Sequence, residues 1–384
     1  MQIREQKDTI LKLLGYGVLF INILVGIWLL LCYAASVLSP ARVAYLELFS
    51  LSTPLAIIAN VIFIFIWLFS KRKWRTLFPL LLLVICYKII PPVFGFNYLA
   101  DNDMTRLNST LKLMLWNVHG MGYFDEAYNH HANEIMDVVR QECPDVLCMP
   151  EYYLLKEDSL KPFTARLLHE NDFKEYRFCT DNPYDFVNFG IAVFSKYTIK
   201  NYKAYPIGKY IYLMQCDMLL PDVKGDKVVR MFFTHLCSFM VSDDDKEMVA
   251  SVRDKKSFDD ADLWKYKKII GKFNKDYAER ATEADNAAYI IRQSPYPVVV
   301  CGDMNDLPAS YTYTAMRGNL NDAFVQQGTG FGRTYNEIFP TLRIDHIFYD
   351  PLAMHVIGYK IPHIRLSDHY PVIANFEIEQ KYSD

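Results

Sequence analysis

The hydrophobic pattern divides the chain into an apolar N-terminal part and a longer part of mixed polarity. Uncharged apolar residues fill positions 13–41 and 48–70, and a weaker run over 76–100 is interrupted by Lys88. The first two runs exceed the roughly 20 residues that a helix needs to cross the core of a bilayer. Residues 1–100 are therefore predicted to form a membrane anchor with about three transmembrane helices, at about 13–37, 47–70 and 76–98.

The third run predicts the weakest of these helices. It holds only 12 uncharged residues before Lys88, and Pro91 and Pro92 follow. It spans the bilayer only if the Lys88 amine reaches the interface. The alternative is an interfacial or re-entrant segment. The first run is much longer than the roughly 7–15 residues of a signal-peptide core, so an uncleaved helix is expected there.

Positive charges in the short loops set the expected topology. Lys and Arg precede the first helix and crowd positions 71–75 of the second loop, whereas Arg42 alone lies in the first loop. With the N-terminus and the second loop in the cytoplasm, three crossings place residues 101–384 outside it. Two crossings would leave those residues cytoplasmic. We therefore expect an integral membrane protein with an extracytoplasmic domain, in a compartment that depends on the third helix.

Beyond the membrane runs, short apolar runs alternate with polar helical stretches, as in layered α/β folds. Residues 101–110 predict a tether and residues 111–384 one catalytic domain. Residues 240–258 are charged and nearly devoid of core residues, which indicates a solvated surface excursion or, alternatively, disorder. Strands are expected at 111–116, 145–149, 190–195, 211–219, 228–235, 297–302, 343–349 and 370–377, and helices at 126–141, 158–170, 262–275 and 278–293.

Charge separates the two parts as sharply as hydropathy does. Residues 1–100 carry nine Lys/Arg and three Asp/Glu, a net +6, and residues 101–384 carry 32 and 41, a net −9. A nucleic-acid-binding domain normally carries a basic footprint, so the acidic balance disfavours tight, non-specific duplex binding. The eight cysteines add little, because buried free thiols are the preferred interpretation for those in strand-like runs.

Polar residues able to do chemistry gather where the expected strands end or begin. Edges of sheets in layered α/β folds are where ligands bind. Each cluster alone is a weak signal, since a strand-end Asp is more often a helix cap and an isolated His, such as His119, His346 or His363, is usually structural. Their number and order favour one shared site made by Asn117, Glu151, His235, Asp303, Asn305, Asp345, Asp368 and His369.

The types of residue in this set indicate metal-assisted hydrolysis. Glu151 and Asp368 offer hard oxygen ligands that suit Mg²⁺ or Mn²⁺, and the chain lacks a His/Cys spacing of the zinc type. Asp345 beside His369 would make a base with a fixed tautomer. His235 could protonate the leaving oxygen or stabilise charge that develops on the phosphate.

Two asparagines complete the predicted chemistry. Asn117 and Asn305 are neutral donors that could hold a phosphate or the attacking water without adding negative charge.

The order of the motifs resembles the endonuclease/exonuclease/phosphatase superfamily, which includes deoxyribonuclease-like nucleases, abasic-site endonucleases, inositol-polyphosphate 5-phosphatases and neutral sphingomyelinases. The resemblance covers about 111–378. It rests on Trp-Asn-Val (116–118), Pro-Asp-Val…Pro-Glu (144–151), Thr-His (234–235), Gly-Asp-Met-Asn-Asp-x-Pro (302–308), Arg-Ile-Asp-His-Ile-Phe (343–348) and Leu-Ser-Asp-His-Tyr-Pro-Val (366–372).

The resemblance implies a four-layered α/β sandwich of two packed β-sheets flanked by helices. It also implies roles for the site residues. Asn117 and Glu151 would lie at the metal and phosphate side with Glu151 as the main ligand, and Asp368 would be a further ligand. The remaining roles would be orientation of water and phosphate by Asp303 and Asn305, support of the general base His369 by Asp345, and assistance to the phosphate or leaving group by His235.

One position departs from the family pattern. Many relatives carry an acidic metal ligand two places after the Asn, where this chain has His119. A second metal on that side is therefore in doubt.

These features favour a membrane-anchored, divalent-metal-dependent hydrolase of phosphoesters. Anchoring beside a bilayer raises the local concentration of lipid headgroups, so a lipid or small-molecule phosphoester is favoured over nucleic acid. An extracytoplasmic nuclease is the alternative, and a non-enzymatic membrane module with an inactive site is the third reading. The sequence does not indicate an oligomeric state.

Overall fold

A computed structural model describes residues 2–99, 110–122, 131–155, 161–180, 187–221, 227–238, 260–337 and 341–378. The predicted excursion at 240–258 lies outside these residues, as does the tether apart from Thr110. The N-terminal elements are α1 (Gln2–Val37), η1 (Leu46–Ser52), α2 (Thr53–Leu68), η2 (Lys73–Thr76), α3 (Leu77–Ile85), η3 (Tyr87–Ile89), α4 (Ile90–Val93) and β1 (Gly95–Phe96).

The rest of the described chain alternates strands and helices. Its elements are β2 (Thr110–Leu115), η4 (His119–Gly122), α5 (Ala132–Glu142), β3 (Val146–Leu155), α6 (Lys161–Glu170), β4 (Glu175–Thr180), β5 (Val187–Ser195), β6 (Thr198–Pro206), β7 (Tyr212–Leu220), β8 (Lys227–His235), α8 (Asp260–Ile291), β9 (Val298–Asp303), α9 (Tyr311–Arg317), β10 (Asn321–Asp322), α10 (Ala323–Gln327), β11 (Thr329–Gly330), β12 (Asp345–Tyr349), β13 (Met354–Lys360) and β14 (Val372–Ile378).

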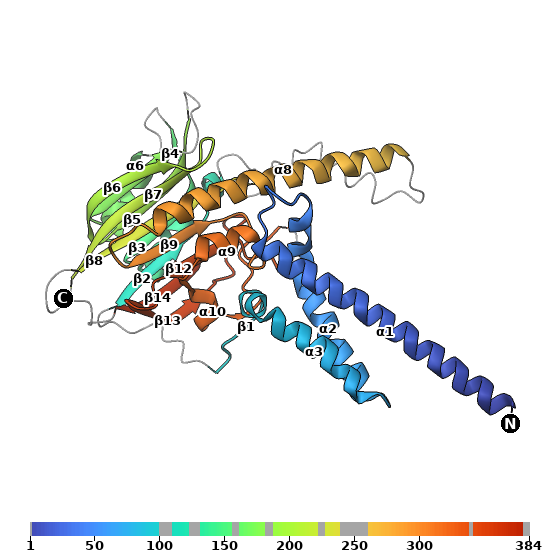
Figure 1. Cartoon of the computed structure of the whole chain (residues 1–384). Coiled ribbons are helices and arrows are strands. Elements are labelled where there is room, and N and C mark those ends of the chain that lie inside the picture. Colours follow the sequence, from blue (N-terminus) through green and yellow to red (C-terminus); the bar gives the residue numbers. More distant parts are fainter. Residues whose placement is uncertain are drawn as a thin grey trace.

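Two six-stranded mixed sheets pack face to face (Figure 1). One has the order β13-β14-β2-β3-β5-β4 and the other the order β10-β12-β9-β8-β7-β6. Within them β2 and β3 are parallel, as are β8 and β9, and the remaining neighbours are antiparallel. Side chains from both inner faces form the central core, which includes Leu113, Val193, Met231 and Val299. Alternating apolar positions on each strand explain why each sheet can cover the other.

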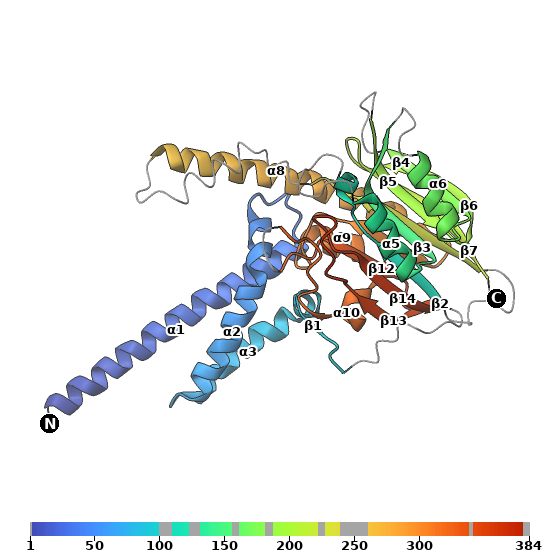
Figure 2. The same cartoon turned by 180° about the vertical axis from the view of Figure 1, so that it is seen from behind.

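Helices cover the two outer faces of this sandwich. Val139 of α5 and Leu167 of α6 pack with the outer side chains of the first sheet. Ala284 and Ala287 of α8 pack with those of the second, together with Tyr313 of α9. The two figures show these helices on opposite sides of the strands (Figures 1 and 2). The predicted four-layered α/β sandwich is confirmed.

All eight expected strands are present, and the longer strands that the pattern missed are β4, β6 and β13. Each of the three lies at the edge of a sheet. Edge strands are partly exposed and carry polar residues on both faces, so they lack the apolar runs that mark a central strand. The two helices expected at 262–275 and 278–293 are one helix, α8, because no Gly or Pro separates them.

The membrane part contains two helices that are long and apolar enough to span a bilayer, Lys12–Val37 with 26 residues and Leu46–Leu68 with 23. The third segment is bent by 61° between Lys73–Ile85 and Tyr87–Val93 and counts as a span only when the two pieces are taken together. The helix expected to continue to residue 98 ends at Val93, because Gly95–Phe96 pairs with β11 instead.

The N-terminal helical part docks directly on the α/β sandwich. The carboxylate of Glu47 in η1 accepts a 3.1 Å hydrogen bond from the backbone N–H of Tyr311, the first residue of α9. Glu47 is only 2% exposed and so is fully enclosed at this junction. A carboxylate at this point satisfies an N–H that the helix leaves unpaired. η1 is therefore fixed to the helix that follows the Gly-Asp-Met-Asn-Asp segment.

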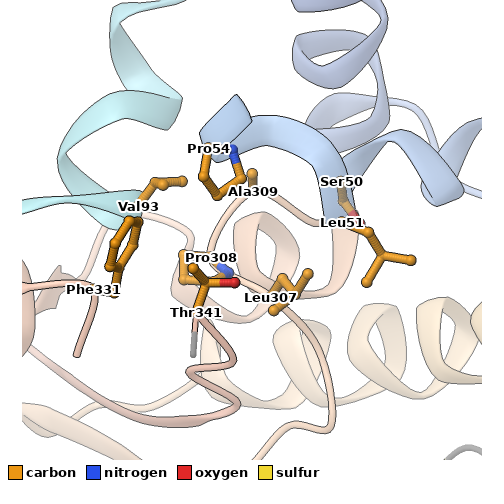
Figure 3. Close-up of a pocket in the computed structure, with 9 residues that line it drawn as sticks. All are labelled: Ser50, Leu51, Pro54, Val93, Leu307, Pro308, Ala309, Phe331 and Thr341. Carbon is orange, nitrogen blue, oxygen red and sulfur yellow. The ribbon is translucent and has the colours of Figure 1, made fainter. Parts of the chain in front are cut away.

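The end of the third apolar segment and the residues after it make a second contact with the sandwich. Arg343 donates a 2.9 Å hydrogen bond to the backbone carbonyl of Pro92, and the Asn97 amide donates to the carbonyls of Val325 and Gly328. Between the two contacts lies a small apolar pocket, lined from the membrane side by Pro54 and Val93 and from the sandwich by residues 307–309, 331 and 341 (Figure 3). The sandwich and the N-terminal helices are thus packed together.

Candidate active site

The register of the strands gathers the candidate residues at one edge of the sandwich. In the parallel pair β8–β9, His235 lies opposite Asp303. In the antiparallel pair β9–β12, Asp345 lies opposite the same Asp303. In the other sheet, hydrogen bonding to β3 continues beyond the end of β2. The Val118 N–H donates to the Pro150 carbonyl at 3.2 Å. This bond keeps Asn117 and Glu151 on neighbouring strands side by side.

Glu151 occupies an irregular point in β3. The pairing register shifts between Met149 and Tyr152, and Glu151 has a φ of 53°. A left-handed conformation is costly for a residue other than glycine, and bulges that turn a side chain toward a ligand are frequent beside active sites. The bulge directs the Glu151 carboxylate out of the ladder and toward the other sheet.

Asn117 links the two sheets. Its side-chain nitrogen donates to Glu151 at 2.9 Å and to Asp303 at 3.0 Å. Its oxygen accepts the backbone N–H of His119 at 3.1 Å, and its side chain is fully buried. Because its side-chain nitrogen and oxygen are both hydrogen-bonded, Asn117 holds two carboxylates from different sheets at a fixed separation.

His369 and Asp345 form a buried pair. Nδ1 of His369 lies 2.8 Å from Asp345, and Nε2 lies 3.6 Å from Asp303. The bond to Asp345 fixes the orientation of the ring, so Nε2 is the nitrogen that faces the site. Burial alone would lower the pKa of His369, but the charges of Asp345 and Asp303 outweigh it and raise the pKa well above 6.5.

The electrostatics of the two central carboxyl groups differ. Burial raises the pKa of Asp303 to about 6, and the charge of Asp345 acts in the same direction. Burial alone would raise the pKa of Glu151 too, but the hydrogen bond with His119 and the charge of His235 bring it down to about 2. Opposite shifts of neighbouring carboxyl groups are typical of catalytic sites.

The remaining predicted residues lie around this centre. Nε2 of His235 is 3.6 Å from Glu151. Asn305 has a φ of 49°, its backbone N–H donates to Asp303 at 2.8 Å, and its amide donates to the Leu236 carbonyl at 2.9 Å. Asp368 is 3.6 Å from the His119 ring. The structure therefore brings all eight predicted residues together.

Several supporting residues were not singled out from the sequence. The hydroxyl of Thr334 accepts the backbone N–H groups of Ile344 and Asp345 at 3.0 and 3.2 Å, and the ring of Tyr335 lies 5.1 Å from that of His369. Neither Thr334 nor Tyr335 belongs to a motif at the end of a predicted strand, so no sequence signal marks them.

Two further supports do lie inside the quoted motifs. The indole N–H of Trp116 donates to the His369 carbonyl at 3.0 Å, and the Ser367 hydroxyl donates to the Asn117 carbonyl at 2.8 Å. Both hydrogen bonds join residues about 250 positions apart. They hold the segment before β14 against the end of β2.

Comparison with protein families decides what these motifs and this fold are. The model of the Endonuclease/Exonuclease/phosphatase family matches residues 114–369. This chain belongs to that family. A second family model, described as a domain of unknown function, matches residues 12–93. A comparison with curated protein sequences gives no match.

Solved structures of the endonuclease/exonuclease/phosphatase family share the fold. A protein of this family from Beutenbergia cavernae has a TM-score of 0.50 and 18% identity, over 70% of this chain and 72% of that chain. One from Bacteroides thetaiotaomicron has a TM-score of 0.50 and 14% identity, over 70% and 97%. A mannosyl-6-phosphatase from the same organism has a TM-score of 0.47 and 16% identity, over 70% and 99%. At these identities the two structures with a TM-score of 0.50 show the fold alone.

Enzymes of the endonuclease/exonuclease/phosphatase family are phosphoester hydrolases that typically use a divalent metal, and the donor set fits such an ion. Ligand atoms of Glu151, His235 and Asp303 lie within 4.8 Å of one another, as do those of Asp303, Asp345 and His369. The second group is less suited to a metal because Asp345 and His369 are bonded to each other. Carboxylate oxygens are the type of ligand that Mg²⁺ and Mn²⁺ prefer.

His119 stands where many members of the endonuclease/exonuclease/phosphatase family have an acid, and its ring lies in the site. Nδ1 is 3.3 Å from Glu151 and 3.6 Å from Asp368. The hydrogen bond to Glu151 raises the pKa of His119 to about 9 although burial opposes it, and the charge of Asp368 adds to the rise. His346, by contrast, is a buried structural residue between Arg343 and the Asp306 carbonyl.

Proposed function

We propose that this protein is a membrane-anchored, divalent-metal-dependent phosphoester hydrolase with the eight predicted residues as its active site. The observation that carries the proposal is the buried Asp345–His369 pair, which directs Nε2 of His369 to within 3.6 Å of Asp303. A histidine oriented by one carboxylate and facing another is the arrangement that acid–base catalysis of hydrolysis needs. The anchor corresponds to residues 1–100, the tether to 101–110 and the catalytic domain to 111–384.

Each residue has a role in attack of water on phosphorus. A divalent cation, Mg²⁺ or Mn²⁺, held by Glu151 with Asp368 and Asn117 nearby, would neutralise charge on the phosphate oxygens. Asp303 and Asn305 orient the attacking water and the phosphate. His235, on the Glu151 side of the centre, stabilises the leaving oxygen or the charge that develops on phosphate.

His369 takes the proton from the attacking water. For this it must be neutral, and the charges of Asp345 and Asp303 oppose that in the metal-free site. A divalent cation held by the neighbouring carboxylates would offset part of their charge, and His369 would then accept the proton at Nε2. Asp345 then stabilises the imidazolium that forms.

The charge of the chain supports a lipid or a small molecule as the source of the phosphoester. Residues 101–384 carry a net charge of −9, so they lack the excess of Lys and Arg that neutralises phosphates, releases counterions and drives binding to nucleic acid. The contacts of the sandwich with the N-terminal segments would hold the catalytic domain beside a bilayer that these segments span.

The experiment uses the full chain in detergent, because the anchor packs against the sandwich. It measures hydrolysis of bis(p-nitrophenyl) phosphate, p-nitrophenyl phosphate, plasmid DNA and phospholipid vesicles. We expect EDTA to abolish activity and Mg²⁺ or Mn²⁺ to restore it, with phospholipid or a chromogenic ester cleaved faster than DNA. Inactivity on all four substrates, or activity that survives EDTA, would contradict the proposal. Preferential cleavage of DNA would favour the nuclease alternative.

A variant of the proposed metal ligand separates metal binding from the chemical step. Glu151→Gln should raise the Mg²⁺ concentration needed for half-maximal activity by at least roughly 10-fold, because a neutral amide binds the ion less tightly than a carboxylate. Glu134→Gln, at an exposed position in the first turn of α5, serves as the matched control and should leave the Mg²⁺ requirement unchanged. An unchanged requirement in Glu151→Gln would remove Glu151 from the ligand set.

We further propose that the catalytic domain lies outside the cytoplasm. The N-terminus of α1 and the basic loop 71–75 lie at the far ends of the membrane helices, and the sandwich packs at their opposite ends (Figures 1 and 2). The contact of Glu47 with Tyr311 and that of Pro92 with Arg343 are both on the sandwich side, so the bent third segment returns the chain to the side of η1. Positive charge inside then puts the sandwich outside.

The exposed thiol of Cys143 offers a test of this topology. A membrane-impermeant maleimide should label Cys143 in intact cells as fully as in lysed cells, because the thiol lies at the end of α5 in the catalytic domain. Cys143→Ser supplies the background. Labelling that requires lysis would place the domain in the cytoplasm and mean that only two segments cross.

A further inference from the structure

The N-terminal part of α8 extends well past the sheets that the rest of the helix covers. We call residues 260–275 the α8 arm. In both views it projects from the sandwich on the side from which α1, α2 and α3 leave it (Figures 1 and 2). At a rise of about 1.5 Å per residue the arm is roughly 24 Å long.

The base of the arm is fixed at the end of the membrane segments. Asn274 accepts a 2.6 Å hydrogen bond from the backbone N–H of Tyr45, in the loop between the two candidate spans. Asn274 therefore lies at the level where the first span ends and the second begins. In a bilayer spanned by these two helices, the arm would start at the surface and continue beside them.

The charge of the arm is opposite to that of its domain. Residues 260–275 contain five lysines and two aspartates, Asp260 and Asp262, a net +3, whereas residues 101–384 together carry −9. Lys267 and Lys268 are exposed. This local positive charge complements the negative surface of a bilayer that contains anionic lipids.

Apolar side chains accompany the lysines. Trp264 is 62% exposed, and the Lys268 amine lies 5.6 Å from the centre of its ring. Ile270 is 37% exposed. Ile270 and Lys267 lie four and seven residues before Asn274, so they share the face of α8 that is bonded to the membrane loop. A tryptophan with lysines and an exposed aliphatic residue is typical of helices that lie at the membrane interface.

We propose that the α8 arm lies on the bilayer and binds anionic lipid headgroups. The lysine ammonium groups pair with lipid phosphates, and Trp264 and Ile270 enter the interfacial layer. The contact would fix the orientation of the catalytic domain over the lipid surface. This inference rests on the membrane anchoring proposed above.

The test compares the full chain in nanodiscs of phosphatidylcholine alone and in nanodiscs that also contain phosphatidylglycerol, by hydrogen–deuterium exchange. We expect the backbone amides of the arm to exchange at least several-fold more slowly with the anionic lipid. The difference should shrink at high salt, where charges are screened beyond about 3 Å at 1 M. The double variant Lys267→Glu/Lys268→Glu should remove it.

A matched control keeps the number of reversed charges the same. Lys200→Glu/Lys203→Glu changes two exposed lysines on the edge strand β6, one of which also packs on an aromatic ring, Tyr205. In Figure 1 β6 lies far from the membrane helices. This variant should retain the slower exchange of the arm in anionic nanodiscs.

Two results would overturn the proposal. Equal exchange rates in the two kinds of nanodisc would show that the arm does not bind anionic headgroups in preference to neutral ones. Slow exchange in both lipids, unaffected by salt and by charge reversal, would show that something other than lipid charge protects the arm. The amides of α1 and α2 report insertion separately, so their rapid exchange would instead refute the anchoring and both proposals with it.

Discussion

Asp345→Asn should lower kcat by roughly 10⁴-fold, as expected when a histidine loses the carboxylate that orients it. The amide keeps the volume of the side chain but can present an N–H to Nδ1 of His369, which favours the wrong tautomer. The 2.8 Å contact between Asp345 and Nδ1 is the closest that the His369 ring makes to a carboxylate. Binding of substrate should change much less than kcat, because Asp345 lies behind His369.

The pH profile separates this role from a structural one. Activity should rise with pH through the pKa of His369, because the neutral form accepts the proton. Asp345 raises that pKa, so its loss should move the rise to lower pH. Asp172→Asn is a matched control at an exposed position whose φ of 58° suits asparagine. A kcat within a few-fold of the parent, or an unshifted profile, would count against the assigned role.

Arg343→Ala should destabilise the protein by about 3–5 kcal/mol, the range typical of removing one partner of a buried ion pair. The Arg343 guanidinium is fully buried, lies 3.0 Å from Asp322, and donates to the Pro92 carbonyl at 2.9 Å. It also stacks over the Phe324 ring at 4.1 Å. Its loss leaves a buried carboxylate without its cation and breaks one link between anchor and sandwich.

Thermal unfolding of the full chain in detergent measures this effect, and a fall in Tm of about 10 °C is expected for a domain of this size. Arg177→Ala removes a half-buried ion pair to Glu175 on an edge strand and should cost less than about 1 kcal/mol. Arg343→Met combined with Asp322→Asn should recover part of the loss, because no unpaired charge remains. A Tm equal to that of the parent would show that the buried pair is energetically neutral.

The sequence predicted the central strands because their apolar residues come in uninterrupted runs. It missed β4, β6 and β13 for the physical reason that edge strands need not be apolar. It divided α8 in two at residues 276–277, although no Gly or Pro there ends a helix. Short elements such as α9 and α10 depend on caps, from Ser310 and Asp322, that are too local to stand out.

All eight candidate residues came from motifs at the ends of strands, and the structure places them around one centre. The motifs were sufficient to find these residues because the strands that carry them meet at one edge. β8 pairs parallel with β9, and β9 pairs antiparallel with β12, so the motif ends of these three strands lie together. The motifs did not contain Thr334 and Tyr335, which contact Asp345 and His369 from a loop with no regular pattern.

By itself, the sequence determined that apolar helical segments precede a layered α/β domain with a set of acids, amides and histidines suited to metal-assisted hydrolysis. Local composition carries that information, because apolar runs and residue types do not depend on distant contacts. Only the tertiary structure decided how the parts act on one another. It placed His119 between Glu151 and Asp368, buried Glu47 against α9 and set the α8 arm beside the membrane loop. Each of these contacts joins residues far apart in the chain, so no periodicity along it could have shown them.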